Sequence, residues 1–145
     1  PMTKRGRGKL VGIASVSGIR GLPGSEAYGA SKSAVITYNE SLRVGLRKTG
    51  IKVQTISPGF VRTPLTSANP YKMPFVLTPD EFAERAVKTI DSDASYRTIP
   101  WQMGLLAKAM RIAPNCLWDK IVANRKQKPR LADKQKAEAE AAQRK

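Results

Sequence analysis

Short apolar runs alternate with longer helical patterns along most of the chain. The runs at 9–15 (KLVGIAS) and 51–58 (IKVQTISP) are bounded by glycine, serine or proline. Apolar runs of this length between such residues are typical of strands buried in a parallel sheet. A shorter run at 96–100 (YRTIP) predicts a third strand.

The longest helical pattern extends from Glu26 to about Lys48. Ser25 precedes it and can cap the helix, and Gly50 follows it and suits the left-handed turn after a helix. Small or apolar residues recur at steps of three and four, which is typical of the apolar stripe of a helix. This predicted stripe consists of Ala27, Ala30, Ala34, Tyr38, Leu42 and Gly45.

The remaining pattern predicts one long loop and three more helices. The segment 59–79 contains four prolines and predicts an irregular segment of the kind that carries function. Residues 78–80 (TPD) have the composition of a helix start. Two helices are predicted at 101–113 and 115–125, separated by Pro114.

The order of these elements predicts the fold class. Strands and helices alternate, as in an α/β protein with a parallel sheet and flanking helices. We expect 119–145 to be a basic, charged tail that is a frayed helix or disordered, because its last stretch, 133–145 (DKQKAEAEAAQRK), is charged and lacks an apolar face. The folded part then spans 1–118.

Composition limits the possible compartments and partners. The chain has 145 residues and a net charge of +15, from 26 basic and 11 acidic side chains concentrated toward both ends. We interpret this charge mainly as solubilising. No nucleic-acid motif accompanies it, and no aromatic residues are interleaved in the basic tail, so we expect no nucleic-acid partner. No apolar run approaches the ~20 residues of a membrane span.

The numbers of cysteine and histidine residues limit the possible compartment and the possible catalytic groups. The single cysteine excludes an internal disulfide framework and, without a signal-peptide pattern, favours a reducing, cytoplasmic compartment. The chain has no histidine. Imidazole-based metal sites and Ser-His-Asp catalysis are therefore excluded, and we expect no metal site.

Tyr28 and Lys32 form a candidate acid/base pair. They are four residues apart in the first predicted helix, so they lie on one face. A nearby ammonium favours the phenolate form of a phenol, which makes the phenol usable as an acid or base near neutral pH. The pair alone is weak support, since a half-buried tyrosine beside a solvated lysine fits the same spacing.

Two other segments are expected at the same place. Ser15 ends the first predicted strand, and residues 58–63 (PGFVRT) leave the second. Ligands of open parallel sheets bind beyond the carboxyl ends of the strands. Three chain segments thus converge on one rim of the predicted sheet.

The motifs IASVSG, YGASK and ISPGFVRT, in this order over about residues 9–65, resemble the C-terminal half of a short-chain dehydrogenase/reductase. The resemblance implies a partial Rossmann-like, doubly wound parallel sheet of about three strands whose N-terminal half is missing. It also implies a dehydrogenase or reductase that uses NAD or NADP.

The same resemblance assigns roles to individual residues. Tyr28 would exchange a proton with the oxygen of an alcohol or carbonyl substrate, Ser15 would hydrogen-bond that oxygen, and Lys32 would favour the phenolate and hold the ribose. The implied cofactor-binding residues are Tyr28, Lys32, Pro58, Gly59, Val61 and Thr63. The implied protein is a homo-oligomer when full length, and the Pro-rich and C-terminal segments suggest an apolar substrate.

One feature of the family is absent from this sequence. No Gly-x-x-x-Gly-x-Gly phosphate loop follows a strand. Only three of about seven family strands are predicted. We therefore expect the isolated chain to bind a nicotinamide cofactor poorly and to show little or no activity.

The C-terminal helices leave an alternative open. Residues 101–130 mix Trp and Leu with Lys and Arg, which suits a non-catalytic binding module at a membrane surface or in a partner's groove. We favour the interpretation that these helices cover the sheet edge and the substrate pocket. The predicted covering residues are Trp101, Leu105, Leu106, Met110 and Leu117.

Overall fold

The computed structural model describes residues 1–67, 69 and 72–123. Its centre is a parallel sheet in the order β1-β2-β3, formed by Gly8–Ile13, Ile51–Pro58 and Tyr96–Ile99. The predicted strands are confirmed to within two residues. Ser15 lies just beyond β1 rather than in it.

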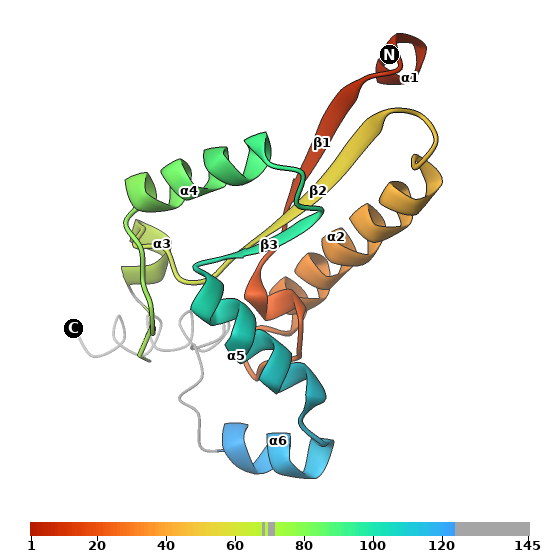
Figure 1. Ribbon diagram of the computed structural model, residues 1–145. Helices are drawn as coiled ribbons and strands as arrows, with labels where there is room; N and C mark the ends of the chain where they lie inside the picture. Colours follow the sequence, from red (N-terminus) through yellow and green to blue (C-terminus); the bar gives the residue numbers. More distant parts are fainter. Residues whose placement is uncertain (68, 70–71, 124–145) are drawn as a thin grey trace, which may run out of the picture.

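Helices pack on both sides of this sheet, with α4 on one side and α2 on the other (Figure 1). The architecture is therefore a partial Rossmann-like α/β fold, as predicted. The helices are α1 (Met2–Arg5), α2 (Glu26–Gly45), α3 (Pro64–Ser67), α4 (Pro79–Asp91), α5 (Trp101–Ile112) and α6 (Asn115–Val122), with a 3-10 turn, η1, at Val16–Gly18.

The apolar core lies between the sheet and α4. Successive side chains of a strand point to opposite faces of the sheet. Val11 and Ile56 point to the face that is covered by α4. Ile56 is fully buried. They pack with residues of α4 and its neighbours, namely Leu77, Phe82, Ala86, Ile90 and Ile99.

The face toward α2 is held by a polar contact. The Asn39 amide of α2 donates a buried hydrogen bond of 3.1 Å to the Thr55 hydroxyl of β2. Gly12 of β1 makes room for this amide, because a Cβ at Gly12 would lie 1.8 Å from the Asn39 nitrogen. The contact anchors α2 to both neighbouring strands.

The predicted apolar stripe of α2 is not its packed face. Ala27, Ala30, Ala34 and Tyr38 are all exposed, and Gly29 and Asn39 are the buried residues of this helix. Alanine favours helix on any face, so its spacing does not identify the side that packs. The packed side is marked instead by a glycine and a polar asparagine.

Local details at the ends of α2 also differ from the prediction. Ser25 stands at the N-cap without a side-chain hydrogen bond, and its carbonyl accepts from the Gly29 N–H at 2.7 Å. The helix ends at Gly45 rather than near Lys48. Gly50 is left-handed, with a φ of 70°, but it lies in the turn before β2.

The described part of the Pro-rich segment 59–79 contains regular structure that was not predicted. It contains the short helix α3, and Val61 pairs with Leu77 in an isolated parallel bridge. The two ends of this segment are therefore held together beside the sheet.

Helix α5 packs along the edge strand β3, as predicted, but the side chains that it buries are not among the five named in the prediction. α5 packs on β3 and η1, and its buried residues are Met103 and Ala107. Trp101, Leu105, Leu106 and Leu117 are exposed. The tail predicted for 119–145 lies, beyond Ala123, outside the described residues.

The start of α4 is closed by a capping box. The Thr78 hydroxyl accepts from the Glu81 N–H at 3.2 Å, and the Glu81 carboxylate accepts from the Thr78 N–H at 2.8 Å. These hydrogen bonds from the backbone and hydroxyl of Thr78 hold the pKa of Glu81 below its ordinary value. The carboxylate therefore stabilises the fold above its unfolded-state pKa, and that stabilisation is lost as pH falls through the lower folded-state pKa.

We expect Thr78→Ala to lower the free energy of unfolding by about 1 kcal/mol at neutral pH, because an N-cap is lost. Glu81→Gln should also destabilise at neutral pH, and its difference from wild type should vanish in strong acid. Urea unfolding at neutral pH and in strong acid measures the free energy of unfolding of each variant. Thr37→Ala, at an exposed position, is the control. An equal effect of Glu81→Gln at both pH values would contradict the assignment.

Candidate active site

The turn after β1 and the first half of α2 approach each other closely. A Cβ at Gly18 would lie 2.7 Å from both the Lys32 carbonyl carbon and the Ser33 backbone nitrogen. A Cβ at Gly29 would lie 3.1 Å from the backbone carbonyl oxygen of Ser17. Glycine is the residue that permits such backbone contact. This contact sets the position of α2 relative to the end of β1.

Tyr28 and Lys32 share one face of α2, as predicted. The Lys32 ammonium lies 5.8 Å from the centre of the Tyr28 ring. It also donates a hydrogen bond of 3.2 Å to the carbonyl of Ile13, the last residue of β1. Tyr28 is 50% exposed.

Ser15 is buried at the end of β1, with 6% of its surface exposed. Its hydroxyl accepts from the Ser17 N–H at 3.2 Å and caps η1. This bond occupies an acceptor site of the oxygen and leaves the hydroxyl proton available for another partner. Within the described part of the chain, no hydrogen bond joins Ser15 to Tyr28.

The exit of β2 contributes backbone and hydroxyl groups. The Gly59 N–H donates to the Ile99 carbonyl at 2.8 Å, and a Cβ at Gly59 would lie 2.7 Å from the Met103 side chain. Pro58 is the last residue of β2 and aligns with Ile99 of β3. Pro58 and Gly59 therefore hold the carboxyl end of β2 against β3 and α5.

Thr66 organises the loop that follows, and sequence reasoning missed it. Its hydroxyl donates to the Val61 carbonyl at 2.7 Å and accepts from the Thr63 N–H at 2.9 Å. The Thr63 hydroxyl accepts in turn from the Thr66 N–H at 3.3 Å. The spacing of two threonines around Pro64 is a signal of helix capping that could have identified it.

The predicted site residues thus lie at the carboxyl ends of β1 and β2, which are neighbours in register. Lys32 is the residue that physically joins two of the segments, since it contacts β1 from α2. A phenol hydroxyl and an ammonium can donate hydrogen bonds to the hydroxyl groups of a ligand. The sequence lacks a glycine-rich loop of the kind that binds a diphosphate, so these residues provide no diphosphate site.

A network around Arg20 fastens the loop between η1 and α2 to the C-terminal helices. The guanidinium donates to the Met110 carbonyl at 2.7 Å, to the Ala113 carbonyl, and to the Asn115 side chain at 2.9 Å. It also lies 5.0 Å from the Trp118 ring. No sequence pattern pointed to this arginine, because its partners lie about 90 residues away.

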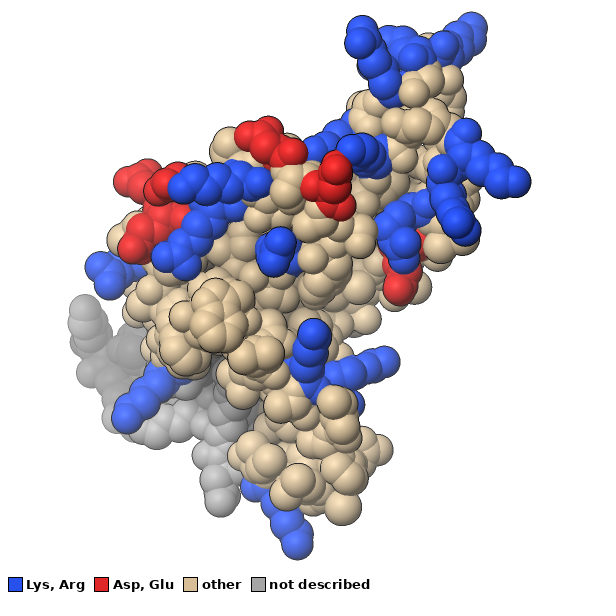
Figure 2. All heavy atoms as spheres, in the orientation of Figure 1, with Lys and Arg blue, Asp and Glu red and all other residues tan. Residues whose placement is uncertain are grey.

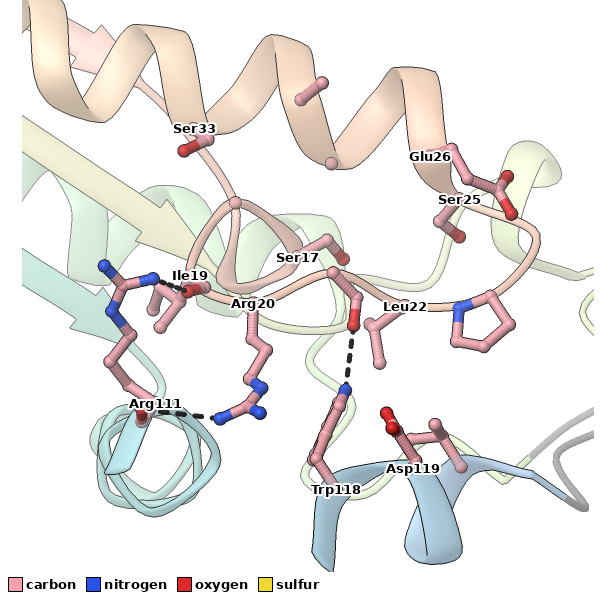
Figure 3. A pocket seen from close by; sticks show the side chains of 16 residues that line it. Ser17, Ile19, Arg20, Leu22, Ser25, Glu26, Ser33, Arg111, Trp118 and Asp119 are labelled. Carbon is pink, nitrogen blue, oxygen red and sulfur yellow. Dashed lines mark hydrogen bonds between the residues drawn. The ribbon is translucent and has the colours of Figure 1, made fainter. Parts of the chain in front are cut away.

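The same network borders a hollow of about 630 Å³ (Figure 3). The Trp118 indole donates to the Gly21 carbonyl at 3.2 Å, and Arg111 donates to the Ile19 carbonyl at 3.3 Å. In Figure 3 these side chains reach from the C-terminal helices toward the loop. The hollow lies beside the candidate site, and its lining includes neither Ser15 nor Tyr28.

Comparison with known proteins gives consistent matches. The short chain dehydrogenase family matches residues 1–73. An uncharacterized oxidoreductase of Myxococcus xanthus is 42% identical over 118 residues, which cover 81% of this chain and 47% of that protein.

Solved structures show the same fold. A short chain dehydrogenase from Burkholderia cenocepacia in complex with NADP has a TM-score of 0.68 at 17% identity, covering 83% of this chain and 49% of that one. An actinorhodin polyketide ketoreductase with NADPH has a TM-score of 0.59 at 26% identity, covering 71% of this chain and 49% of that one.

The chain spans about half the length of these relatives. The family match nevertheless extends over half of the chain and includes both the end of β1 and the Tyr28–Lys32 pair. The chain belongs to the short chain dehydrogenase family.

Proposed function

We propose that the chain forms the substrate-side half of an NAD(P)-dependent oxidoreductase that interconverts an alcohol and a carbonyl compound. Tyr28 is the acid/base that exchanges a proton with the substrate oxygen. The observation that carries this proposal is the position of Lys32, 5.8 Å from the Tyr28 ring and 3.2 Å from the Ile13 carbonyl at the end of β1.

Lys32 has two roles in this proposal. Its ammonium lies over the Tyr28 ring and helps to fix the position of the phenol, and its ammonium protons are donors for the ribose hydroxyls of the cofactor. The contact with the Ile13 carbonyl holds the flexible side chain over the strand end. A lysine anchored in this way loses less conformational freedom when a nucleotide binds.

Ser15 serves as the second hydrogen-bond donor to the substrate oxygen. Its oxygen is held by the Ser17 N–H, so its proton can be directed at a ligand. Two fixed donors, Ser15 and Tyr28, stabilise negative charge that develops on that oxygen. The bound nicotinamide supplies or accepts the hydride.

The exit of β2 holds the nicotinamide end of the cofactor. Pro58 and Gly59 supply backbone close to the strand end, and Val61 and Thr63 lie in the loop organised by Thr66. The NADPH and NADP named for the similar structures support a nicotinamide cofactor. Both NAD and NADP are compatible with the residues present here.

The substrate is a small alcohol or carbonyl compound, which we propose to be apolar.

The longer relatives suggest that the active protein contains a second, nucleotide-binding half. The exposed small residues Ala30 and Ala34 of α2 are suited to packing against another helix in a homo-oligomer.

A chimera tests the proposal. The stretch of this chain that aligns with the Myxococcus xanthus oxidoreductase replaces its counterpart there. A panel of ketones and alcohols is first screened with the relative itself, and any that it converts serve as substrates. We expect the folded chimera to oxidise NADPH or NADH in the presence of a ketone. A folded chimera that binds the cofactor but transfers no hydride would contradict the proposal.

The isolated chain provides the complementary measurement. We expect a fluorescence titration with NADPH to give an affinity weaker than micromolar, because the diphosphate has no helix N-terminus with a glycine-rich loop to bind. Bovine serum albumin at equal concentration controls for nonspecific binding. Saturation at micromolar NADPH would show that these residues hold the cofactor by themselves and that the assignment of separate halves is wrong.

A further inference from the structure

Thr66 connects Val61 and Thr63, two of the residues that the proposed function assigns to the nicotinamide end of the cofactor. The side chains of Thr63 and Thr66 are both half-buried. A threonine hydroxyl has one proton to donate and two lone pairs that accept. The partners of these two hydroxyls therefore determine which hydrogen-bonding groups remain for a ligand.

The proton of the Thr66 hydroxyl goes to a backbone carbonyl. Its nearest carbonyl acceptor is the Val61 oxygen at 2.7 Å, and the Thr63 carbonyl oxygen lies farther away, at 3.1 Å. The Thr63 N–H donates to the same hydroxyl at 2.9 Å and occupies one lone pair. The Thr63 hydroxyl oxygen lies 3.2 Å from the Thr66 hydroxyl oxygen. Because the Thr66 proton is already used, we infer that Thr63 is the donor in this last bond.

This arrangement leaves the Thr63 hydroxyl as an acceptor toward a ligand. Its proton is directed at Thr66, and one of its lone pairs accepts from the Thr66 N–H at 3.3 Å. One lone pair remains. A ligand group beside Thr63 should therefore carry a hydrogen-bond donor.

The backbone of Val61 provides the opposite polarity. Val61 pairs with Leu77 in the isolated parallel bridge, and the hydrogen bonds to Leu77 come from the two sequence neighbours of Val61. The N–H and carbonyl of Val61 itself therefore point away from Leu77. The carbonyl accepts from Thr66, and the N–H has no hydrogen bond within the described residues. The loop thus offers one donor, the Val61 N–H, and one acceptor, the Thr63 hydroxyl.

A primary amide matches this pair of groups, because it combines a carbonyl acceptor with N–H donors. The nicotinamide ring carries such an amide. The three residues of the network are uncharged, and Figure 2 shows that acidic atoms gather over α4 and basic atoms at the N-terminal end of the molecule. Selection at this loop therefore depends on the direction of hydrogen bonds rather than on charge.

We propose that Thr66 is a positioning residue that makes the loop specific for the carboxamide of the nicotinamide ring, by holding the Thr63 hydroxyl as an acceptor. This role rests on the proposed function, which places the nicotinamide at the exit of β2. Thr66 acts through Thr63 and Val61 and needs no contact of its own with the cofactor.

Binding of two cofactors to the chimera tests this role. The aligned stretch spans 81% of the chain and therefore includes Thr66, near the middle of the sequence. The nicotinamide dinucleotide is compared with its 3-acetylpyridine analogue, in which a methyl group replaces the amide nitrogen. Isothermal titration calorimetry measures both dissociation constants without turnover. We expect the nicotinamide form to bind about tenfold more tightly, because the analogue leaves the Thr63 acceptor unpaired.

Thr66→Val removes the hydroxyl and keeps the shape of the side chain. The affinity for the nicotinamide form should fall about tenfold, whereas the affinity for the analogue should change by less than about twofold, because the released Thr63 hydroxyl can then turn and donate. Thr66→Ser keeps the hydroxyl and should preserve the preference for the amide. Equal weakening of both cofactors by Thr66→Val would mean that Thr66 only stabilises the loop, and this would overturn the proposal.

Ser67→Ala is the matched control. Ser67 follows Thr66 in α3, is exposed, and donates to the Pro64 carbonyl at 2.7 Å, outside the network. It should keep the wild-type preference. In the chimera without any ligand, the Thr63 N–H should exchange with solvent faster in Thr66→Val than in Ser67→Ala, because it loses its acceptor. Equal exchange rates would contradict the network.

The outcomes separate the role of Thr66 from the proposed reaction. A folded chimera that binds both cofactors equally, or neither of them, would overturn the role of Thr66. A chimera that prefers the nicotinamide form but transfers no hydride would contradict the acid/base role of Tyr28 and would support the role of Thr66.

Discussion

Tyr28→Phe is expected to lower the kcat/KM of the chimera by about 10²- to 10⁴-fold, the usual contribution of a general acid or base. The change removes one oxygen atom and keeps the ring beside Lys32. The Tyr28 hydroxyl forms no hydrogen bond within the described part of the chain. The unfolding free energy should therefore change by less than about 0.5 kcal/mol.

Tyr38→Phe is the control for this substitution. Tyr38 lies on the same helix and is also exposed, at 65%, but it is ten residues from Tyr28. Its loss should leave kcat/KM within about twofold, as expected for a surface change. Steady-state kinetics of both variants, with urea unfolding alongside, separate chemistry from stability. Equal activities of the two variants would rule out Tyr28 as the acid/base.

Gly18→Ala is expected to destabilise the chain by about 1–3 kcal/mol, the range for overpacking. The added methyl carbon would meet the Lys32 carbonyl carbon and the Ser33 nitrogen, each at 2.7 Å. Both are backbone atoms of α2, so no side-chain rotation relieves the contact. The helix must shift, and Lys32 shifts with it away from the Ile13 carbonyl.

Gly21→Ala in the same loop is the matched control. A Cβ at Gly21 would have no atom within 4 Å. This substitution should be neutral or stabilise by about 0.4–1 kcal/mol, because alanine restricts the unfolded chain. Urea unfolding of both variants gives the comparison. If Gly18→Ala were as stable as Gly21→Ala, the close approach of η1 and α2 would be wrong.

Tyr28→Phe and Gly18→Ala test two kinds of contact, one that the sequence predicts and one that it does not. The Tyr28–Lys32 pair is predictable because residues four apart in a helix share a face whatever else the chain does. The contact of Gly18 with Lys32 joins segments that are 14 positions apart, and no local pattern requires it.

The sequence by itself determined the three strands, the parallel α/β class, the start of α4 and the shared face of Tyr28 and Lys32. Each depends on local physics: buried strands are continuous apolar runs, and Thr78 and Glu81 cap their own helix. Only the tertiary structure decided the packed side of α2, the Arg20 network and the exposure of the large apolar side chains of α5 and α6. These depend on which distant surfaces meet, as the buried Asn39–Thr55 contact illustrates, and hydrophobic periodicity alone does not specify the partner of a face.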